Sequence, residues 1–269
     1  MIRMANRLFR WEQKKLRRKT EAAKQWGGVS AALFLEGEMN ALADADCFFF
    51  YGGRMRPKGL LTVFFPDEEH AEITVAEFVP EGGGLSELYK SALRECERVG
   101  VTRIHTVRNP VCGFDTKRIR GIRLSHDWSE YMLCIGMKEL ADAGEAFVSV
   151  AGAYGKYEVK KEEAPEQDGT LRYILYRNGQ EATECRILPA DGGRQCYLFG
   201  LKTKEEFRRK GMATRLLTEI AKEHADEDGA VLRLQVSSKN EPAERLYRKL
   251  GFVTEEEREY YRTEVSDGK

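Results

Sequence analysis

A basic turn that leads directly into a helical pattern is the feature that most limits how this 269-residue chain can fold. The turn, residues 207–213, reads FRRKGMA, and apolar residues then recur every four positions, which predicts a helix over 212–225. A strand is expected just before it, over 196–203. The first amides of a helix lack intrahelical partners and lie at the positive end of its dipole. The strand, the basic turn and the helix together therefore predict an anion site. The alternative is a surface turn whose cations are simply solvated.

Strand and helix patterns alternate along the rest of the chain. Asn178 and Gly179 separate two apolar runs and predict a tight β-hairpin. The other strands are expected at 47–51, 60–65, 72–79, 101–107, 130–137, within 147–159, and at 171–176, 182–188, 231–236, 252–254 and 260–265. The other helices are expected at 5–25, 29–44, 85–98 and 241–251. This mixture is typical of the α/β (α+β) class.

Two stretches of the chain repeat the same order of strand, glycine turn, helix and strand, which predicts two related domains. The polar stretch 138–145 is the expected linker, and it divides the chain into residues 1–138 and 139–269. In both stretches the glycines that frame the helix lie 18 residues apart: Gly82 and Gly100, and Gly211 and Gly229.

The chain as a whole has no electrostatic bias, because Lys plus Arg and Asp plus Glu both number 44. This balance argues against a dedicated nucleic-acid-binding protein, which carries a strong excess of basic residues. The first 30 residues differ, with nine Lys or Arg against Glu12 and Glu21. We interpret this segment as one or two surface helices with solvated charges. Contact with nucleic acid, an acidic partner or a membrane surface stays open as the alternative.

The placement of cysteine and histidine gives no sign of a metal site. The six cysteines form no CxxC pair, and the four histidines do not cluster with them. Dispersed cysteines and an N-terminus without an apolar signal sequence favour reduced thiols and a cytoplasmic location. Cys196 is expected to be a buried, inert thiol. No stretch approaches the ~20 apolar residues that a membrane-spanning helix needs.

A second motif, residues 240–252, reads NEPAERLYRKLGF. Its Asn240 is a good helix N-cap, and Tyr247 falls on the apolar stripe of the helix. The two motifs together, over about residues 196–254, resemble the GNAT superfamily of acetyl-CoA-dependent N-acyltransferases. The family turn, Gln/Arg-x-x-Gly-x-Gly/Ala, matches at 208–213. The later family pattern matches at Asn240, Ala243, Leu246, Tyr247, Leu250, Gly251 and Phe252.

The resemblance implies a role for each matching residue and involves no metal. In the family, the turn holds the pyrophosphate of CoA, the preceding strand pairs with the pantetheine arm, and the asparagine lies near that arm. The implied acetyl-CoA contacts are Leu201, Lys202, Thr203, Arg208, Arg209, Lys210, Gly211, Met212, Ala213, Thr214 and Asn240. Tyr247 is expected to protonate the departing CoA thiolate, although its spacing also fits a core tyrosine, just as Asn240 also fits a helix cap.

The resemblance also implies two GNAT-like domains, each a mixed, mostly antiparallel sheet flanked by helices. Only the domain at 139–269 keeps the basic turn, so the domain at 1–138 is expected to be degenerate and not to bind acetyl-CoA in the usual way. When the two glycine turns are aligned at Gly82 and Gly211, the cation positions hold Val79, Pro80 and Glu81.

The implied activity is acetyl transfer from acetyl-CoA to a primary amine of a small molecule or a protein, by direct attack in a ternary complex. Many family members place a carboxylate base on the strand before the turn, but 196–201 contains none. Glu181, Glu184 and Asp191 are nearby candidates, with solvent as the alternative. The missing carboxylate favours the other possible function, a non-catalytic acyl-CoA-binding sensor or interaction module.

Overall fold

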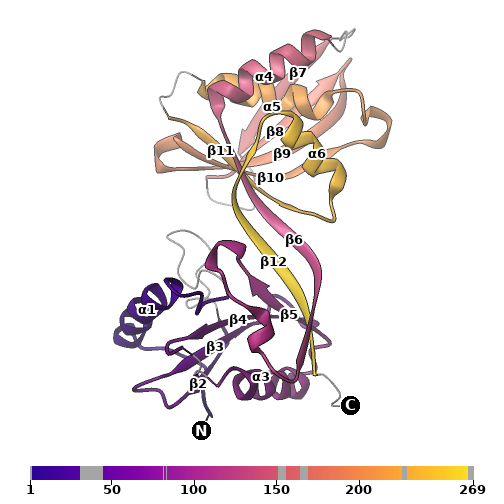
Figure 1. Cartoon of the computed structure of the whole chain (residues 1–269). Helices are drawn as coiled ribbons and strands as arrows, with labels where there is room; N and C mark the ends of the chain where they lie inside the picture. The colour runs from indigo at the N-terminus through magenta and orange to yellow at the C-terminus, as the bar shows by residue number, and fades with distance from the viewer. Residues whose placement is uncertain are drawn as a thin grey trace. The chain divides into compact units, whose positions relative to one another are not determined.

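The chain forms two compact units in the computed structural model (Figure 1). The first unit consists of Met1–Ser129 and Glu257–Lys269, and the second of Glu130–Glu256. Two long strands, β6 (Ile122–Gly136) and β12 (Val253–Val265), each contribute residues to both units. The structure describes residues 2–30, 45–80, 82, 84–150, 156–163, 169–225 and 229–265.

The first unit is a mixed sheet with a helix on each face. Helix α1 (Arg10–Lys24) and helix α3 (Leu85–Val99) contribute to separate apolar clusters. Successive strand residues point to opposite faces, so Phe49 packs in the cluster of α3 and Phe50 in the cluster of α1. The strand order is β1-β2-β3-β4-β5-β12, antiparallel except for the parallel pair β4–β5.

The remaining elements of the first unit are short. The strands are β1 (Ile2–Ala5), β2 (Cys47–Tyr51), β3 (Gly59–Phe64), β4 (His70–Glu77) and β5 (Arg103–Arg108). Two 3-10 helices follow β5, at Pro110–Cys112 and Thr116–Arg118.

The second unit is a mixed sheet in the order β6-β11-β10-β9-β8-β7, antiparallel except for the parallel pair β10–β11. Its strands are β7 (Tyr157–Glu163), β8 (Leu171–Arg177), β9 (Gln180–Ala190), β10 (Gln195–Thr203) and β11 (Val231–Ser237). Its helices are α4 (Met137–Val150), α5 (Met212–His224) and α6 (Glu241–Lys249), with 3-10 turns at Asp191–Gly193 and Glu205–Phe207.

Helices α4 and α5 approach each other closely at Gly144. A Cβ atom on Gly144 would lie only 2.9 Å from the Cβ atom of Thr218 on α5. The contact is therefore possible only because residue 144 has no side chain. Both helices contribute to the core of the second unit, where Leu140 and Leu217 are fully buried.

The predicted hairpin and the predicted helix after the basic turn are confirmed. Asn178 and Gly179 join β8 to β9, and both adopt left-handed backbone angles, with φ of 51° and 79°. The helix predicted over 5–25 begins only at Arg10, because residues 2–5 form β1. Most of the helix predicted over 29–44 lies outside the described residues.

Three predictions in the second half of the chain are wrong. The stretch 138–145 is part of α4 rather than a linker, because Leu140 and Ala141 supply an apolar face among its polar residues. The strand expected within 147–159 begins only at Tyr157. The two strands expected at 252–254 and 260–265 are one strand, β12.

The division of the chain into units also differs from the boundary expected after residue 138. The first unit consists of residues up to Ser129 and, after the second unit, of the residues from Glu257 onward. The reason is that β6 and β12 each contribute residues to both units, so neither strand ends where a unit ends.

Gly144→Ala is expected to destabilise the protein although alanine is the better helix former. Helix propensity favours alanine by about 1 kcal/mol, whereas overpacking against Thr218 costs about 1–3 kcal/mol. Urea unfolding followed by circular dichroism measures the balance. The double variant Gly144→Ala/Thr218→Ala is expected to recover part of the loss. A Gly144→Ala protein more stable than the wild type would contradict the close helix contact.

Candidate functional site

The basic turn starts α5 through two residues with left-handed backbone angles. Phe207 anchors the turn in the core, with 8% of its surface exposed. Arg209 has a φ of 57° and Gly211, the N-cap, a φ of 76°. The amide of Arg215 donates to the carbonyl of Gly211 over 2.9 Å. The amides of residues 212–214 therefore precede the first helical hydrogen bond and remain donors for an anion.

The three cations of the turn are exposed and are not neutralised. The Nε of Arg208 donates to the carbonyl of Thr203 over 3.3 Å, and the Nζ of Lys210 donates to the carbonyl of Glu206 over 2.6 Å. Among the residues that the structure describes, none of Arg208, Arg209 and Lys210 has an ion pair with a carboxylate. The turn therefore combines uncompensated positive charge with the positive end of the α5 dipole.

Strands β10 and β11 separate just before the turn. Their parallel pairing runs only from Gln195↔Val231 to Leu198↔Leu234. A bulge follows between Phe199 and Lys202, where Gly200 has a φ of 64°, and β10 continues to pair with β9 on its other side. Residues 201–203 therefore have no strand partner toward β11 within the described chain, so their backbone groups can pair with an extended ligand.

Asn240 caps helix α6. Its side-chain oxygen accepts a hydrogen bond from the amide of Ala243 over 3.4 Å, and Pro242 lies in the first turn. Asn240 therefore acts as a helix cap, one of the two roles expected for it, and its side chain is exposed on the surface.

Tyr247 lies in the core of the second unit, with 6% of its surface exposed and its ring edge against Phe252. Burial raises the pKa of Tyr247 to about 12, and the charge of nearby Cys185 acts in the same direction. The phenol therefore carries its proton at neutral pH, which is the form that a general acid requires.

The three candidate carboxylates that the sequence offered are each paired with a cation. Glu181 lies 3.7 Å from the Nζ of Lys204, and Asp191 lies 3.1 Å from Arg194. Glu184 accepts from the Nε of Arg172 over 2.8 Å. Cys196 is fully buried, as expected.

The structure adds two residues to the surroundings of the turn that the sequence did not indicate. The ring of Phe147, on α4, lies 4.0 Å from the position of a Cβ atom on Gly211, and the Nζ of Lys249, on α6, lies 4.1 Å from the centre of that ring. Only the fold brings these helices together, and 147 was expected outside a helix. The sequence feature that came closest to indicating these residues was the match to the family pattern at Leu250, which follows Lys249 directly.

The first unit contains the same separation of parallel strands, but its own chain occupies it. The pairing of β4 with β5 ends at Ile73↔Thr106. Beyond it, the amide of Ser30 donates to Val75 over 2.9 Å, and the carbonyl of Ser30 accepts from the amide of Asn109 over 2.7 Å. Ser30 is fully buried. The segment at Ser30 thus satisfies backbone groups of both strands, which in the second unit remain available.

The glycine turns of the two units align differently from the sequence-based expectation. Gly84, rather than Gly82, is the N-cap of α3, and its φ of 64° matches the left-handed Gly211. With this correction, the turn of the first unit still lacks cations, because the three residues before the N-cap are Glu81, Gly82 and Gly83.

The described residues lack two further features. No helix among them is long and apolar enough to cross a membrane. No three His, Cys, Asp or Glu side chains among them come together in a group that could hold a metal ion.

Comparison with known proteins identifies the fold. Residues 177–262 match the model of the FR47-like protein family. No curated protein matches the sequence. The matched segment includes the basic turn, Asn240 and Tyr247, so all the motifs that suggested the GNAT superfamily lie in it.

Solved structures resemble the whole chain. A GCN5-related N-acetyltransferase from Sphaerobacter thermophilus has a TM-score of 0.60 at 10% identity, over 100% of this chain and 97% of that one. A tandem GNAT protein from the clavulanic acid biosynthesis pathway has a TM-score of 0.58 at 13% identity, over 100% of both chains. A GNAT-family acetyltransferase from Colwellia psychrerythraea has a TM-score of 0.52 at 16% identity, over 97% and 99%.

The chain therefore has the fold of these tandem GNAT proteins, and its residues 177–262 match the FR47-like family model. The predicted fold class, two GNAT-like domains of mixed, mostly antiparallel sheet flanked by helices, is confirmed.

Hydrogen exchange is expected to distinguish the two strand separations. The amides of Glu77 and Asn109 donate to Gly28 and Ser30, and should exchange slowly. The segment 199–203 of β10, without a partner toward β11, should exchange faster in the ligand-free protein. Exchange followed by mass spectrometry of peptides over the two regions gives the comparison. Equal protection of both regions would mean that the strands of the second unit are closed.

Proposed function

We propose that the second unit is an N-acetyltransferase that binds acetyl-CoA and transfers its acetyl group to a primary amine of a small molecule or a protein. The proposed reaction is direct attack of the amine in a ternary complex, with no metal, in the cytoplasm. The proposed domains are a degenerate one in the first half of the chain and a working one in the second.

The observation that carries this proposal is the separation of β10 from β11 next to the uncompensated cationic turn. The backbone of Leu201, Lys202 and Thr203 has no strand partner on the side toward β11, and that side suits the amide groups of a pantetheine arm. The turn then supplies what a pyrophosphate requires: α5 amides, Arg208 and Lys210. We assign Arg209, Gly211, Met212, Ala213 and Thr214 to the same phosphate contact, and Asn240 to the arm.

Tyr247 is the proposed general acid. When the amine attacks the thioester, the carbonyl carbon becomes tetrahedral, and collapse of this intermediate breaks the carbon–sulfur bond. The departing thiolate then takes the phenolic proton of Tyr247, which burial keeps in place at neutral pH. Since Glu181 and Asp191 are paired with cations, we propose that the amine loses its proton to solvent.

One acetyl-CoA per chain is part of the proposal. In the first unit, Ser30 occupies the strand separation and the turn lacks cations. An acyl-CoA would have to displace the buried segment at Ser30 before it could pair with β4.

Titration calorimetry with acetyl-CoA tests the binding site. The wild type is expected to bind one equivalent, and Arg208→Glu/Gly211→Glu is expected to bind at least about a hundredfold more weakly, because two negative charges then oppose the pyrophosphate. Lys138→Glu, an exposed cation at the other end of α4, is the control and should bind normally. Absence of binding to the wild type, or unchanged binding by the double variant, would refute the site.

Tyr247→Phe tests the general acid. We expect kcat to fall by about 10²–10⁴ with acetyl-CoA affinity and folding unchanged, because only the proton donor is lost. Thiol release from acetyl-CoA with a panel of primary amines provides the measurement. Tyr176→Phe, which removes a hydroxyl from a half-buried tyrosine of the same unit, should keep full activity. Full activity of Tyr247→Phe would remove this residue from the mechanism.

A non-catalytic acyl-CoA sensor is the second candidate function. The observation in its favour is that β10 carries no carboxylate and that Glu184 is held by Arg172. The amine panel separates the two functions. Acetyl-CoA binding in the absence of thiol release with every amine indicates a sensor, whereas amine-dependent release indicates an enzyme.

A further inference from the structure

The exposed face of α1 in the first unit carries a stripe of cations with one aromatic ring, and further along the same face Glu21 pairs with Lys24. At about 100° of rotation per residue, Arg10, Trp11, Lys14 and Arg18 share one side of the helix. All four are exposed, and the opposite side packs into the core through residues such as Leu16. The helix is therefore firmly attached to its unit while this stripe faces solvent.

Helix stability does not account for this stripe. Like charges at positions i and i+4, here Arg10 with Lys14 and Lys14 with Arg18, destabilise a helix. Arg10 also sits in the first turn, where the helix dipole disfavours a cation. In the described part of the chain, none of the three forms an ion pair with a carboxylate. The stripe is thus an arrangement that a bound anion would stabilise.

The loop between β2 and β3 extends this surface. Arg54 pairs with Glu12 of α1 and donates from Nη2 to the carbonyl of Arg7 over 2.9 Å, and the Nζ of Lys15 donates to the carbonyl of Met55. These contacts hold the loop against the start of α1. They bring a further exposed cation, Arg56, to its edge.

Large apolar side chains lie exposed between these cations. Phe9, Trp11 and Met55 are 59%, 49% and 64% exposed. The guanidinium of Arg54 lies 5.4 Å from the ring centre of Phe9. We call this area the basic aromatic surface, and it comprises Phe9, Arg10, Trp11, Lys14, Arg18, Met55 and Arg56.

We propose that the basic aromatic surface binds single-stranded nucleic acid. Cations one helical turn apart, from Arg10 to Arg18 over about 12 Å of the helix, follow a row of phosphates. Exposed aromatic rings beside them offer stacking platforms for unpaired bases, whatever their sequence. The charge is local, since the chain as a whole carries none, and the site is separate from the proposed acetyl-CoA site.

A membrane surface fits this region less well. A helix that lies in a lipid interface inserts an apolar face. The apolar face of α1 is already buried, with Leu16 and Ala23 each 2% exposed. Only Trp11 of the exposed stripe is apolar.

The experiment measures fluorescence anisotropy of a labelled 12-nucleotide single-stranded RNA with the full chain over a series of salt concentrations. We expect affinity to fall steeply with salt. Lys14→Glu/Arg18→Glu should weaken binding at least about tenfold and reduce the salt slope by about 1.4, because two phosphate contacts are lost. Trp11→Ala should weaken binding about fivefold or more without changing the slope, because stacking carries no charge.

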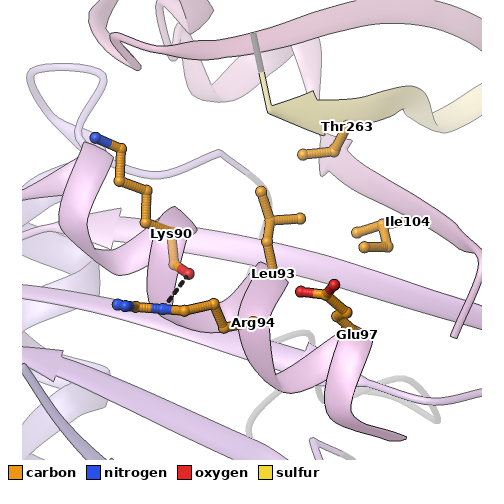
Figure 2. A pocket seen from close by; sticks show the side chains of 6 residues that line it. All are labelled: Lys90, Leu93, Arg94, Glu97, Ile104 and Thr263. Carbon is orange, nitrogen blue, oxygen red and sulfur yellow. Dashed lines mark hydrogen bonds between the residues drawn. The ribbon is translucent and has the colours of Figure 1, made fainter. Parts of the chain in front are cut away.

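The matched control lies on α3 of the same unit. Lys90 and Arg94 are also a Lys–Arg pair at i and i+4, and both are exposed. They border a hollow of about 520 Å³ lined by Leu93, Glu97, Ile104 and Thr263, as Figure 2 shows. No aromatic side chain lines this hollow. Lys90→Glu/Arg94→Glu makes the same change of charge and should leave RNA affinity within about twofold of the wild type.

The variants are expected to fold, because residues 11, 14 and 18 are all exposed; circular dichroism checks this. Three outcomes would overturn the proposal: no RNA binding by the wild type, equal losses in the α1 and α3 variants, or binding to phosphatidylserine vesicles in place of RNA. Acetyl-CoA is left out of the assay, so failure of the proposed acetyl transfer would not affect the result.

Discussion

The early end of pairing between β10 and β11 is the constraint on which the candidate site depends. Four residue pairs join the two strands, and the bulge at Gly200 then bends β10 away while it stays paired with β9. The backbone beyond the bulge is left without a partner on one side. Because the same strand leads into the turn anchored by Phe207, the unpaired backbone and the start of α5 become adjacent parts of one site.

The two units have the same backbone arrangement, but different residues occupy it. Each contains a parallel strand pair that separates, followed by a helix that begins at a left-handed glycine, Gly84 or Gly211. In the first unit, Ser30 fills the separation with hydrogen bonds to both strands. In the second unit, the cations and the open backbone remain. The two units thus share a backbone arrangement and differ in the residues placed on it, because backbone geometry and surface charge are set by different residues.

Much of the second unit could be predicted from local sequence. The apolar repeat of α5, the turn residues Asn178 and Gly179 and the cap at Asn240 act within a few residues of themselves, so their signals are local. Helix α4 was missed because its apolar face is narrow and includes Gly144, a poor helix former that the contact with α5 requires. Its polar composition resembled a linker.

Other features depend on residues far apart in the chain. The sequence could not indicate that Ser30 lies between β4 and β5, because its partners are Val75 and Asn109. The pairing of Glu184 with Arg172 and the position of Lys249 over Phe147 likewise arise from the fold. Charge alone could not separate a solvated helix from a binding surface. The exposure of Phe9 and Trp11 beside the cations, on which the proposed binding surface rests, is known only from the fold.

The division of β12 between the units has a consequence for synthesis on the ribosome. Residues 259–262 pair with 105–108 of β5, and Glu259 also forms an ion pair with Arg108 over 3.0 Å. A nascent chain therefore exposes the edge of β5 until the entire second unit has been translated. The first unit is the first to be translated, but it is the last to be complete, because it includes residues 257–269. During that interval the open edge is a site at which a chaperone or a neighbouring nascent chain can pair.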